Sequence, residues 1–235
     1  MAKHALAVAG LNNKARADTA NTHYLQEAGD LESKFMMDNR SVDPAQAQQR
    51  YTDYVGSLEQ LRQKYRGTLG NMMSQSDFDQ QSRTAQRYMI TSGSRTIAQG
   101  THTYREAAFN GSQATLAAAA AASTDPAAQE SFKQQITDGA YAWGKSEGLP
   151  DDAIKADIQR RTSAVDMSII DGKSRTDPEG AMTYFQAHRG EMTPEHIGAT
   201  EAKLDQDLTV HGGYMAAQAG LASGITSGGR GVPTP

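Results

Sequence analysis

The chain has 235 residues, no cysteine and a formal net charge of −4 at pH 7. The lack of cysteine excludes disulfides, thiolate nucleophiles and sulfur-ligated zinc sites, and the acidic balance argues against a general nucleic-acid-binding surface. Hydrophobic residues make up 37% of the chain and aromatic residues 6%, so the composition favours several packed helices over one large apolar core.

The first 42 residues are predicted to form an N-terminal helical segment. Their opening, MAKHALAVAGLNN, places an apolar run from Ala5 to Ala9 behind Lys3, which is shorter than the roughly 7–15 residues of a signal-peptide core. The longest apolar run elsewhere, residues 116–122, is far below the roughly 20 residues that span a bilayer. We therefore expect a soluble chain without a transmembrane span.

Five prolines predict where helices begin. Four follow a residue with a side-chain oxygen, and the fifth precedes two aspartates: Asp43-Pro44, Asp125-Pro126, Asp177-Pro178, Thr193-Pro194 and Pro150-Asp151-Asp152. A side-chain oxygen at the N-cap accepts hydrogen bonds from the free N–H groups of the first turn, and proline at the next position has no N–H to leave unpaired. Gln46 lies at the N3 position of a capping box. Each pair therefore predicts a helix start, the alternative being a simple turn.

Residues 43–122 are predicted to form a long antiparallel helical hairpin or a coiled-coil-like pair. In the first helix, apolar residues recur at the heptad spacing that is typical of a coiled-coil seam: Tyr51, Tyr54, Leu58, Leu61, Tyr65 and Met72. A break is expected within residues 67–77, where Gly, Asn and Ser gather, with Ser76 or Asp77 capping the helix that follows.

The second helix is predicted to cover residues 78–122. Gly93, Gly100 and Gly111 each weaken it by about 1 kcal/mol relative to alanine. Its packing face is poor in large side chains and consists of Ala85, Met89, Ile97, Tyr104, Ala108 and Leu116. Close backbone approach or a partner chain would then supply part of its burial. The alanines at 117–122 are interpreted as the end of an Ala-rich helix, with a self-associating or membrane-active segment as the alternative.

Residues 123–222 are predicted to form a small bundle of shorter helices. Apolar residues share one face after each proline signal: Phe132, Ile136, Ala140 and Trp143; Ile154, Ile158, Val165 and Ile169; Ala181, Met182, Tyr184 and Phe185; Ile197, Leu204 and Leu208. Gly148 and Gly190 are expected to end two of these helices. Alternating strand patterns are almost absent, so the predicted fold class is all-α.

The last segment, residues 223–235, changes composition to Gly, Ser, Thr and Pro. Such a segment buries too little apolar surface to offset its ordering entropy. It is predicted to be a flexible tail or a linker to a further domain beyond Pro235.

The residues most suggestive of chemistry are His188, Glu191, Glu195 and His196. The Gly190 stop and the cap before Pro194 place the two histidines on different helices, and no H-E-x-x-H spacing is present. We interpret these four residues as solvated side chains of a helix–helix loop. The other histidines, His4, His23, His102 and His211, are scattered along the chain. The sequence therefore predicts no catalytic residue, no bound cofactor and no metal site.

Two other binding patterns are weak. The GGRG at residues 228–231 has neither the strand nor the helix that a phosphate loop requires. A stripe of basic and aromatic side chains along one long helix would suit nucleic acid, but a solvated helix face is the preferred interpretation: Arg83, Arg87, Tyr88, Arg95, Tyr104 and Arg105.

The order of elements resembles a known family. The resemblance lies in LEQLRQKYRGTL and FDQQSRTAQRYMITSGSRTIAQ, then GAYAWGKSEGLPDDAIKADIQRRTSAVDMSII, then DPEGAMTYFQAHRGEMTPEHIGATEAKLDQDL, and it covers roughly residues 43–220. These segments are similar to the helical region upstream of the lytic transglycosylase domain in large phage internal virion, or ejection, proteins. The Ser- and Glu-containing catalytic signature of that domain is missing, so the resemblance implies no active site in this chain.

The resemblance implies a non-enzymatic segment of a bacteriophage virion that assembles through helices and helps the genome cross the host cell envelope. Its partners would be copies of itself or other virion proteins, with contact to the host envelope during infection. The alternative is a monomeric bacterial envelope or secreted adaptor whose helices bind a protein partner in a groove. An enzyme is a third reading, which would require a pocket with acids converging around Glu191 and Glu195.

Overall fold

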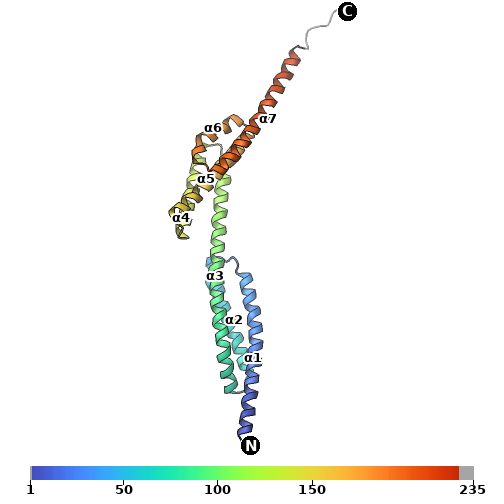
Figure 1. Ribbon diagram of the computed structural model, residues 1–235, viewed down its shortest axis with the longest axis vertical. Helices are drawn as coiled ribbons and strands as arrows, with labels where there is room; N and C mark the ends of the chain where they lie inside the picture. The colour runs from blue at the N-terminus through green and yellow to red at the C-terminus, as the bar shows by residue number, and fades with distance from the viewer. Residues whose placement is uncertain (1, 228–235) are drawn as a thin grey trace, which may run out of the picture. The chain divides into compact units, whose positions relative to one another are not determined.

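The computed structural model describes residues 2–227, which form seven α-helices and one short 3-10 helix, with no strand among them (Figure 1). The predicted all-α class is confirmed. The chain divides into two compact units, Met1–Ala108 and Phe109–Pro235, and the division falls within one continuous helix, α3 (Met72–Ala122). The division predicted after residue 42 lies inside the first unit and the one predicted after residue 122 lies inside the second.

The proline signals mark helix starts as predicted. Helices begin at or directly after each of them: α2 (Pro44–Gly67), α4 (Pro126–Ser146), α5 (Asp151–Ser174), α6 (Pro178–His188) and α7 (Pro194–Ser227). Asp43, Asp125 and Asp177 accept hydrogen bonds from first-turn N–H groups at 2.9, 3.0 and 2.9 Å. The capping box predicted for Gln46 is wrong, because its side-chain oxygen accepts from Arg50 instead, at 2.8 Å.

In the first unit, α1 (Ala2–Asp38), α2 and the first part of α3 lie side by side around one core (Figure 1). Aromatic side chains join the helices: the rings of Phe35 and Tyr54 stack with centroids 4.0 Å apart, and Tyr24 meets Phe78 edge-on at 5.9 Å. The buried members of this core are Ala17, Ala20, Tyr24, Ala28, Phe35, Tyr54, Leu58, Leu69, Phe78 and Met89.

Polar contacts pair α2 with α3 in opposite order along the two helices. Arg62 Nη1 lies 2.6 Å from Asp79 Oδ1, Gln86 Nε2 donates to Glu59 Oε2 at 3.0 Å, and the Tyr54 hydroxyl donates to the Met89 carbonyl at 3.3 Å. The three contacts taken from Arg62 to Tyr54 on α2 run from Asp79 to Met89 on α3, so the residue number falls on one helix as it rises on the other.

Two glycines of α3 allow neighbouring segments to approach its backbone closely. A Cβ at Gly93 would lie 2.5 Å from Tyr54 Cε1, and one at Gly100 would overlap the carbonyl oxygen of Asn39. The Gly100 carbonyl also accepts a hydrogen bond from the N–H of Val42 at 3.1 Å. Gly100 therefore allows the α1–α2 connection to pack against α3, whereas Gly111 has no neighbour within 4 Å. The helix runs through all three predicted weak points without a break.

Three details predicted for this region are wrong. Met72 begins α3 with 86% of its surface exposed, so the seam of α2 ends before it. The N–H of Ser74 donates to Asn71 Oδ1 at 2.9 Å, so Asn71 caps α3, whereas Ser76 and Asp77 lie inside the helix. Tyr104 and Ala108, which were predicted on a packing face, are exposed.

In the second unit, the end of α3 packs with α4, α5, α6 and α7, and a 3-10 helix, η1 (Arg189–Glu191), joins the last two. One part of the core contains Ala120, Ile136, Val165 and Ile169, and another contains Ile170, Ala181, Phe185, Met192 and Leu204. Gly148 adopts a φ of 70° just after Glu147, the C-cap residue of α4, as its predicted role in ending that helix requires. Because α3 ends at Ala122 with Ala120 buried, the alanine run is the end of a packed helix.

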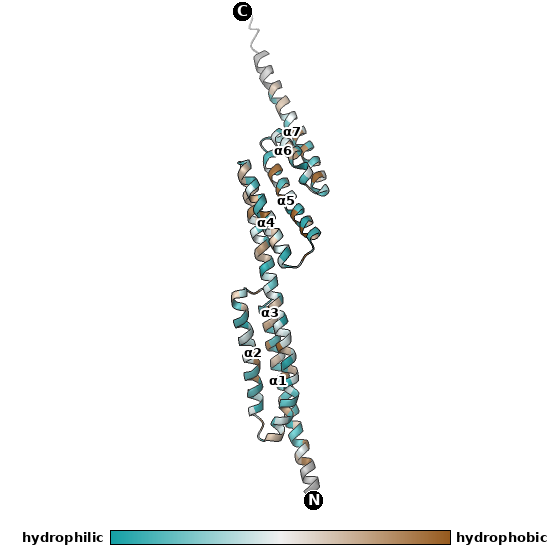
Figure 2. Cartoon of the chain, turned by 90° about the vertical axis from the view of Figure 1, so that its left-hand side faces the viewer, coloured by the Kyte–Doolittle hydropathy of each residue, from teal (hydrophilic) through white to brown (hydrophobic). Residues whose placement is uncertain are grey.

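Within the described residues, no helix has the length and hydropathy needed to cross a membrane. Hydrophilic (teal) and hydrophobic (brown) residues are interspersed along the helices of each unit (Figure 2). Helix α7 continues to Ser227 and so includes the first residues of the segment predicted as a tail. The remainder of that segment, residues 228–235 with its GGRG, lies outside the described residues.

Candidate functional site

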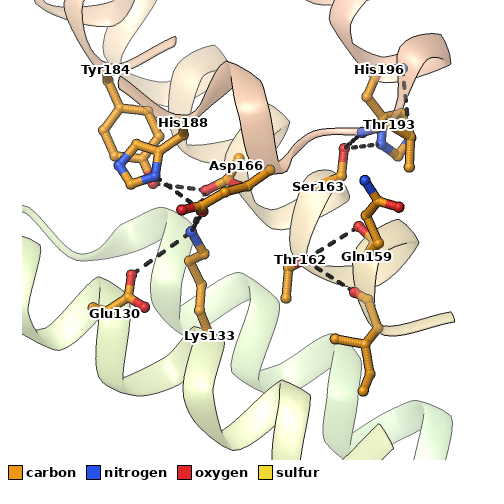
Figure 3. Close-up of polar contacts among 12 residues, drawn as sticks. Glu130, Lys133, Gln159, Thr162, Ser163, Asp166, Tyr184, His188, Thr193 and His196 are labelled. Carbon is orange, nitrogen blue, oxygen red and sulfur yellow. Dashed lines mark hydrogen bonds and ion pairs between the residues drawn. The ribbon is translucent and has the colours of Figure 1, made fainter. Parts of the chain in front are cut away.

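A buried ion pair joins α4 and α5 in the second unit. Lys133 on α4 places its Nζ 3.0 Å from Asp166 Oδ1 on α5, with 6% of the lysine side chain and none of the aspartate side chain exposed (Figure 3). The hydroxyl of Tyr184 on α6 donates to the same carboxylate oxygen at 2.9 Å. Charges are rarely buried unless they are paired in this way. Three helices therefore meet at one polar cluster.

Further charged groups surround the pair at the edge of the unit. The Lys133 Nζ lies 3.3 Å from Glu191 Oε2 and 3.8 Å from Glu130 Oε2, and both glutamates are mostly exposed. His188 Nδ1 lies 3.5 Å from Glu191 Oε2, and its ring is 4.2 Å from that of Tyr184. One ammonium thus faces three carboxylates.

The protonation states follow from burial and charge. Burial raises the pKa of Asp166, although the Lys133 ammonium and the Tyr184 hydroxyl act in the opposite direction. Burial acts to lower the pKa of Lys133, but its carboxylate partners, Asp166 foremost, outweigh this and raise that pKa. Burial also raises the pKa of Tyr184, which the Asp166 charge raises further. At neutral pH Lys133 is therefore an ammonium and Tyr184 a neutral donor.

A second polar group, around Ser163, supports the start of α7. Ser163 Oγ accepts a hydrogen bond from the N–H of Thr193 at 3.0 Å and lies 2.7 Å from His196 Nδ1 (Figure 3). A serine–histidine contact is found in hydrolases, but there the hydroxyl must reach a substrate carbonyl. Ser163 is fully buried and its oxygen pairs an N–H at the helix start, so its role here is structural.

The cluster around Lys133 opens onto a groove of about 420 Å³ between α4 and α5, lined by Glu130, Lys133, Gln134, Thr137, Lys155, Ile158, Gln159, Thr162 and Glu191. Solutes can therefore reach the glutamates from solvent. The cluster around the Lys133 ammonium suits the binding of cations, because three carboxylates lie within 4 Å of that one ammonium group.

The four residues singled out in the sequence lie in different surroundings. His188 lies on α6 and His196 on α7, as predicted, and the structure does not bring them together. It brings His188 to Glu191, and Lys133 links Glu191 to buried Asp166. Glu191 is mostly exposed in the connection between α6 and α7, as interpreted, whereas His188 lies on α6 and is partly buried. Glu195 is exposed in the first turn of α7 and does not line the groove.

Lys133 and Asp166 were missed, although each carries a signal. Lys133 lies three residues before Ile136 and seven before Ala140, and Asp166 lies four residues before Ile170, so both occupy the apolar register of their helices. A charge in that register indicates a buried partner. Which residue is the partner depends on how α4 packs against α5.

The basic and aromatic side chains of α3 are exposed, which a solvated face and a nucleic-acid-binding stripe both require. Its members on the surface are Arg83, Arg87, Tyr88, Arg95, Tyr104 and Arg105.

Comparisons with protein-family models, with curated proteins and with solved structures gave no match to this chain. The site is therefore interpreted from its own geometry.

Proposed function

We propose that this chain is a non-enzymatic segment of a bacteriophage virion that assembles through its helices and assists delivery of the genome across the host cell envelope. The proposal rests on the sequence resemblance to phage ejection proteins over residues 43–220 and on the all-helical fold. In this proposal, α2 and α3 act as an antiparallel hairpin, which the reversed order of their contacts supports, and α4–α7 act as the bundle that follows.

The observation that carries the assembly part of the proposal is the exposed stretch of α7. Leu204 is fully buried and Leu208 half-buried, but residues 209–216 are all exposed. Met215 continues the helical face of Leu204 and Leu208, and 53% of its surface is exposed. Helices in proteins gain most of their stability by packing an apolar face, so this stretch favours a partner helix.

A second copy of the chain is the partner that we propose, because the face in question continues the apolar face that α7 already packs into its own unit. Burying a methionine side chain stabilises an interface by roughly 1.5–3 kcal/mol. Replacing Met215 by glutamate would remove this contribution and leave a charge in the interface.

The test is the solution mass of the full chain, measured by light scattering over a range of concentrations. We expect the mass to rise with concentration. The Met215→Glu variant should require a protein concentration at least about tenfold higher for the same degree of assembly. The control is Gln206→Glu, which adds the same charge at an exposed position on the opposite face of α7 and should leave assembly unchanged.

A monomer at every concentration would contradict self-assembly and favour the alternative, a helical adaptor. One observation supports that alternative: a groove of about 610 Å³ lies between α1 and α2 in the first unit, and its walls include Leu31, Phe35, Asp38, Arg50 and Tyr54. Its mixed apolar and charged lining suits a peptide segment of a protein partner.

A further inference from the structure

Three side chains with metal-ligating groups converge beside the buried ion pair of the second unit. Asp166 comes from α5, His188 from the last turn of α6 and Glu191 from η1, and one ligand atom from each lies within 4.8 Å of the other two. His188 Nδ1 and Glu191 Oε2 are 3.5 Å apart. Two ligands of a tetrahedral zinc ion, each about 2.1 Å from the metal, are roughly 3.4 Å apart.

Asp166, the buried residue of the three, has a carboxylate oxygen without a hydrogen-bond partner, and this favours a bound ligand. Asp166 is fully buried, and its Oδ1 accepts from both Tyr184 and Lys133, whereas its Oδ2 is buried without any hydrogen-bond partner. Buried carboxylate oxygens are ordinarily paired, because leaving one unsatisfied is costly. A cation is the partner that a carboxylate oxygen accepts most readily.

The local charge also favours a cation. Lys133 supplies one positive charge against the three carboxylates of Glu130, Asp166 and Glu191, which lie 3.8, 3.0 and 3.3 Å from its Nζ. The ammonium group therefore occupies part of the space that a metal ion would need. A shift of this flexible side chain toward Glu130 would release the other two carboxylates, and the groove beside Glu191 gives an ion access from solvent.

We propose that Asp166, His188 and Glu191 form a binding site for a divalent transition-metal ion of the zinc class. An imidazole combined with carboxylates suits zinc and its neighbours, whereas magnesium and calcium prefer oxygen ligands alone. The hydroxyl of Tyr184 orients the Asp166 carboxylate from the outer shell. The bound ion ties α5, α6 and η1 together, and Lys133 competes with it for the carboxylates of Asp166 and Glu191.

The test uses the full chain and Zn²⁺, with binding measured by calorimetry at neutral pH. We expect one Zn²⁺ per chain, no displacement by an equal concentration of Mg²⁺, and loss of about 100-fold or more in affinity in both His188→Gln and Glu191→Gln. Both side chains reach the surface, so these variants should fold. The control is His211→Gln, which removes an exposed histidine from α7 outside the cluster and should leave affinity unchanged.

Two further measurements report on the site directly. Co²⁺ in place of Zn²⁺ should give visible absorption bands that are lost in His188→Gln. Lys133→Met removes the competing ammonium, so we expect its Zn²⁺ affinity to rise at least about tenfold and Zn²⁺ to raise its melting temperature more than that of the unaltered chain. If Lys133→Met fails to fold, the comparison of the His188 and Glu191 variants with the control still decides the question.

The absence of stoichiometric binding at millimolar Zn²⁺ would overturn the proposal. Binding that survives both His188→Gln and Glu191→Gln would overturn it equally, because the ion would then be held elsewhere.

Discussion

At the scale of single residues, one glycine and one buried ion pair make contacts between segments far apart in the sequence. Gly100 brings the backbone of α3 against Asn39 and Val42, where the α1–α2 connection packs. Lys133 and Asp166 place opposite charges in the buried contact between α4 and α5. Glycine is unfavourable within a helix and a charge is unfavourable in a protein interior. Here the Asn39 backbone requires the glycine, and each charge of the pair requires the other.

The close approach at Gly100 predicts a large effect of one methyl group. In Gly100→Ala, the new Cβ would overlap a backbone oxygen that no side-chain rotation can move, so we expect unfolding free energy to fall by about 2–3 kcal/mol. Urea denaturation followed by circular dichroism measures this.

The matched control for that variant is Gly56→Ala in α2. A Cβ at Gly56 would meet no atom within 4 Å, so the better helix propensity of alanine should stabilise the chain by about 0.5–1 kcal/mol. Equal effects of the two substitutions would show that helix propensity alone governs both positions.

At the scale of helices, charged side chains hold α2 against α3. Arg62 lies between Glu59 on its own helix and Asp79 on α3, and Gln86 of α3 donates to Glu59 as well. Hydrogen bonds from Arg62 lower the pKa of Glu59 from 4.5 to about 2, with Gln86 and Gln63 adding to the effect.

The lowered pKa of Glu59 predicts acid sensitivity of the first unit. A carboxyl group with a depressed pKa in the folded state contributes stability above its unfolded pKa, and this contribution is lost as pH falls from about 4.5 toward 2. Because 38% of the Glu59 side chain is exposed and solvent screens it, we expect a loss of roughly 1 kcal/mol.

Urea unfolding at pH 6, 4 and 3 measures this loss. Glu59→Gln should be less stable than the unaltered chain at pH 6 by a similar amount and should depend less on pH across this window. A variant with the same pH dependence as the unaltered chain would place the acid sensitivity at another carboxyl group.

At the scale of the whole molecule, each of the two units has its own core, and α3 contributes to both. The single tryptophan of the chain, Trp143, lies in the second unit, where its ring stacks on that of Phe109 with centroids 4.9 Å apart. Tryptophan fluorescence therefore reports on the second unit, whereas circular dichroism reports on the helices of both.

Separate cores predict that a substitution in one unit leaves the unfolding of the other unchanged. We expect Gly100→Ala to lower the urea midpoint seen by circular dichroism while the midpoint of Trp143 fluorescence shifts by less than the experimental error. An equal shift of both signals would mean that the two units unfold as one cooperative body.

The fold class and the starts of α2, α4, α5, α6 and α7 are predictable from the sequence alone, because a proline at or just before the first residue of a helix acts within one turn of the chain. The start of α3, which has no such proline, was predicted too late. The sequence also indicated the seam of α2 through Tyr54 and Leu58. The tertiary structure was needed to show that the α1–α2 connection packs against Gly100 and that Asp166 meets Lys133 and Tyr184. Such contacts depend on the register and crossing of helices far apart in the sequence, and the spacing of residues along one helix does not specify these.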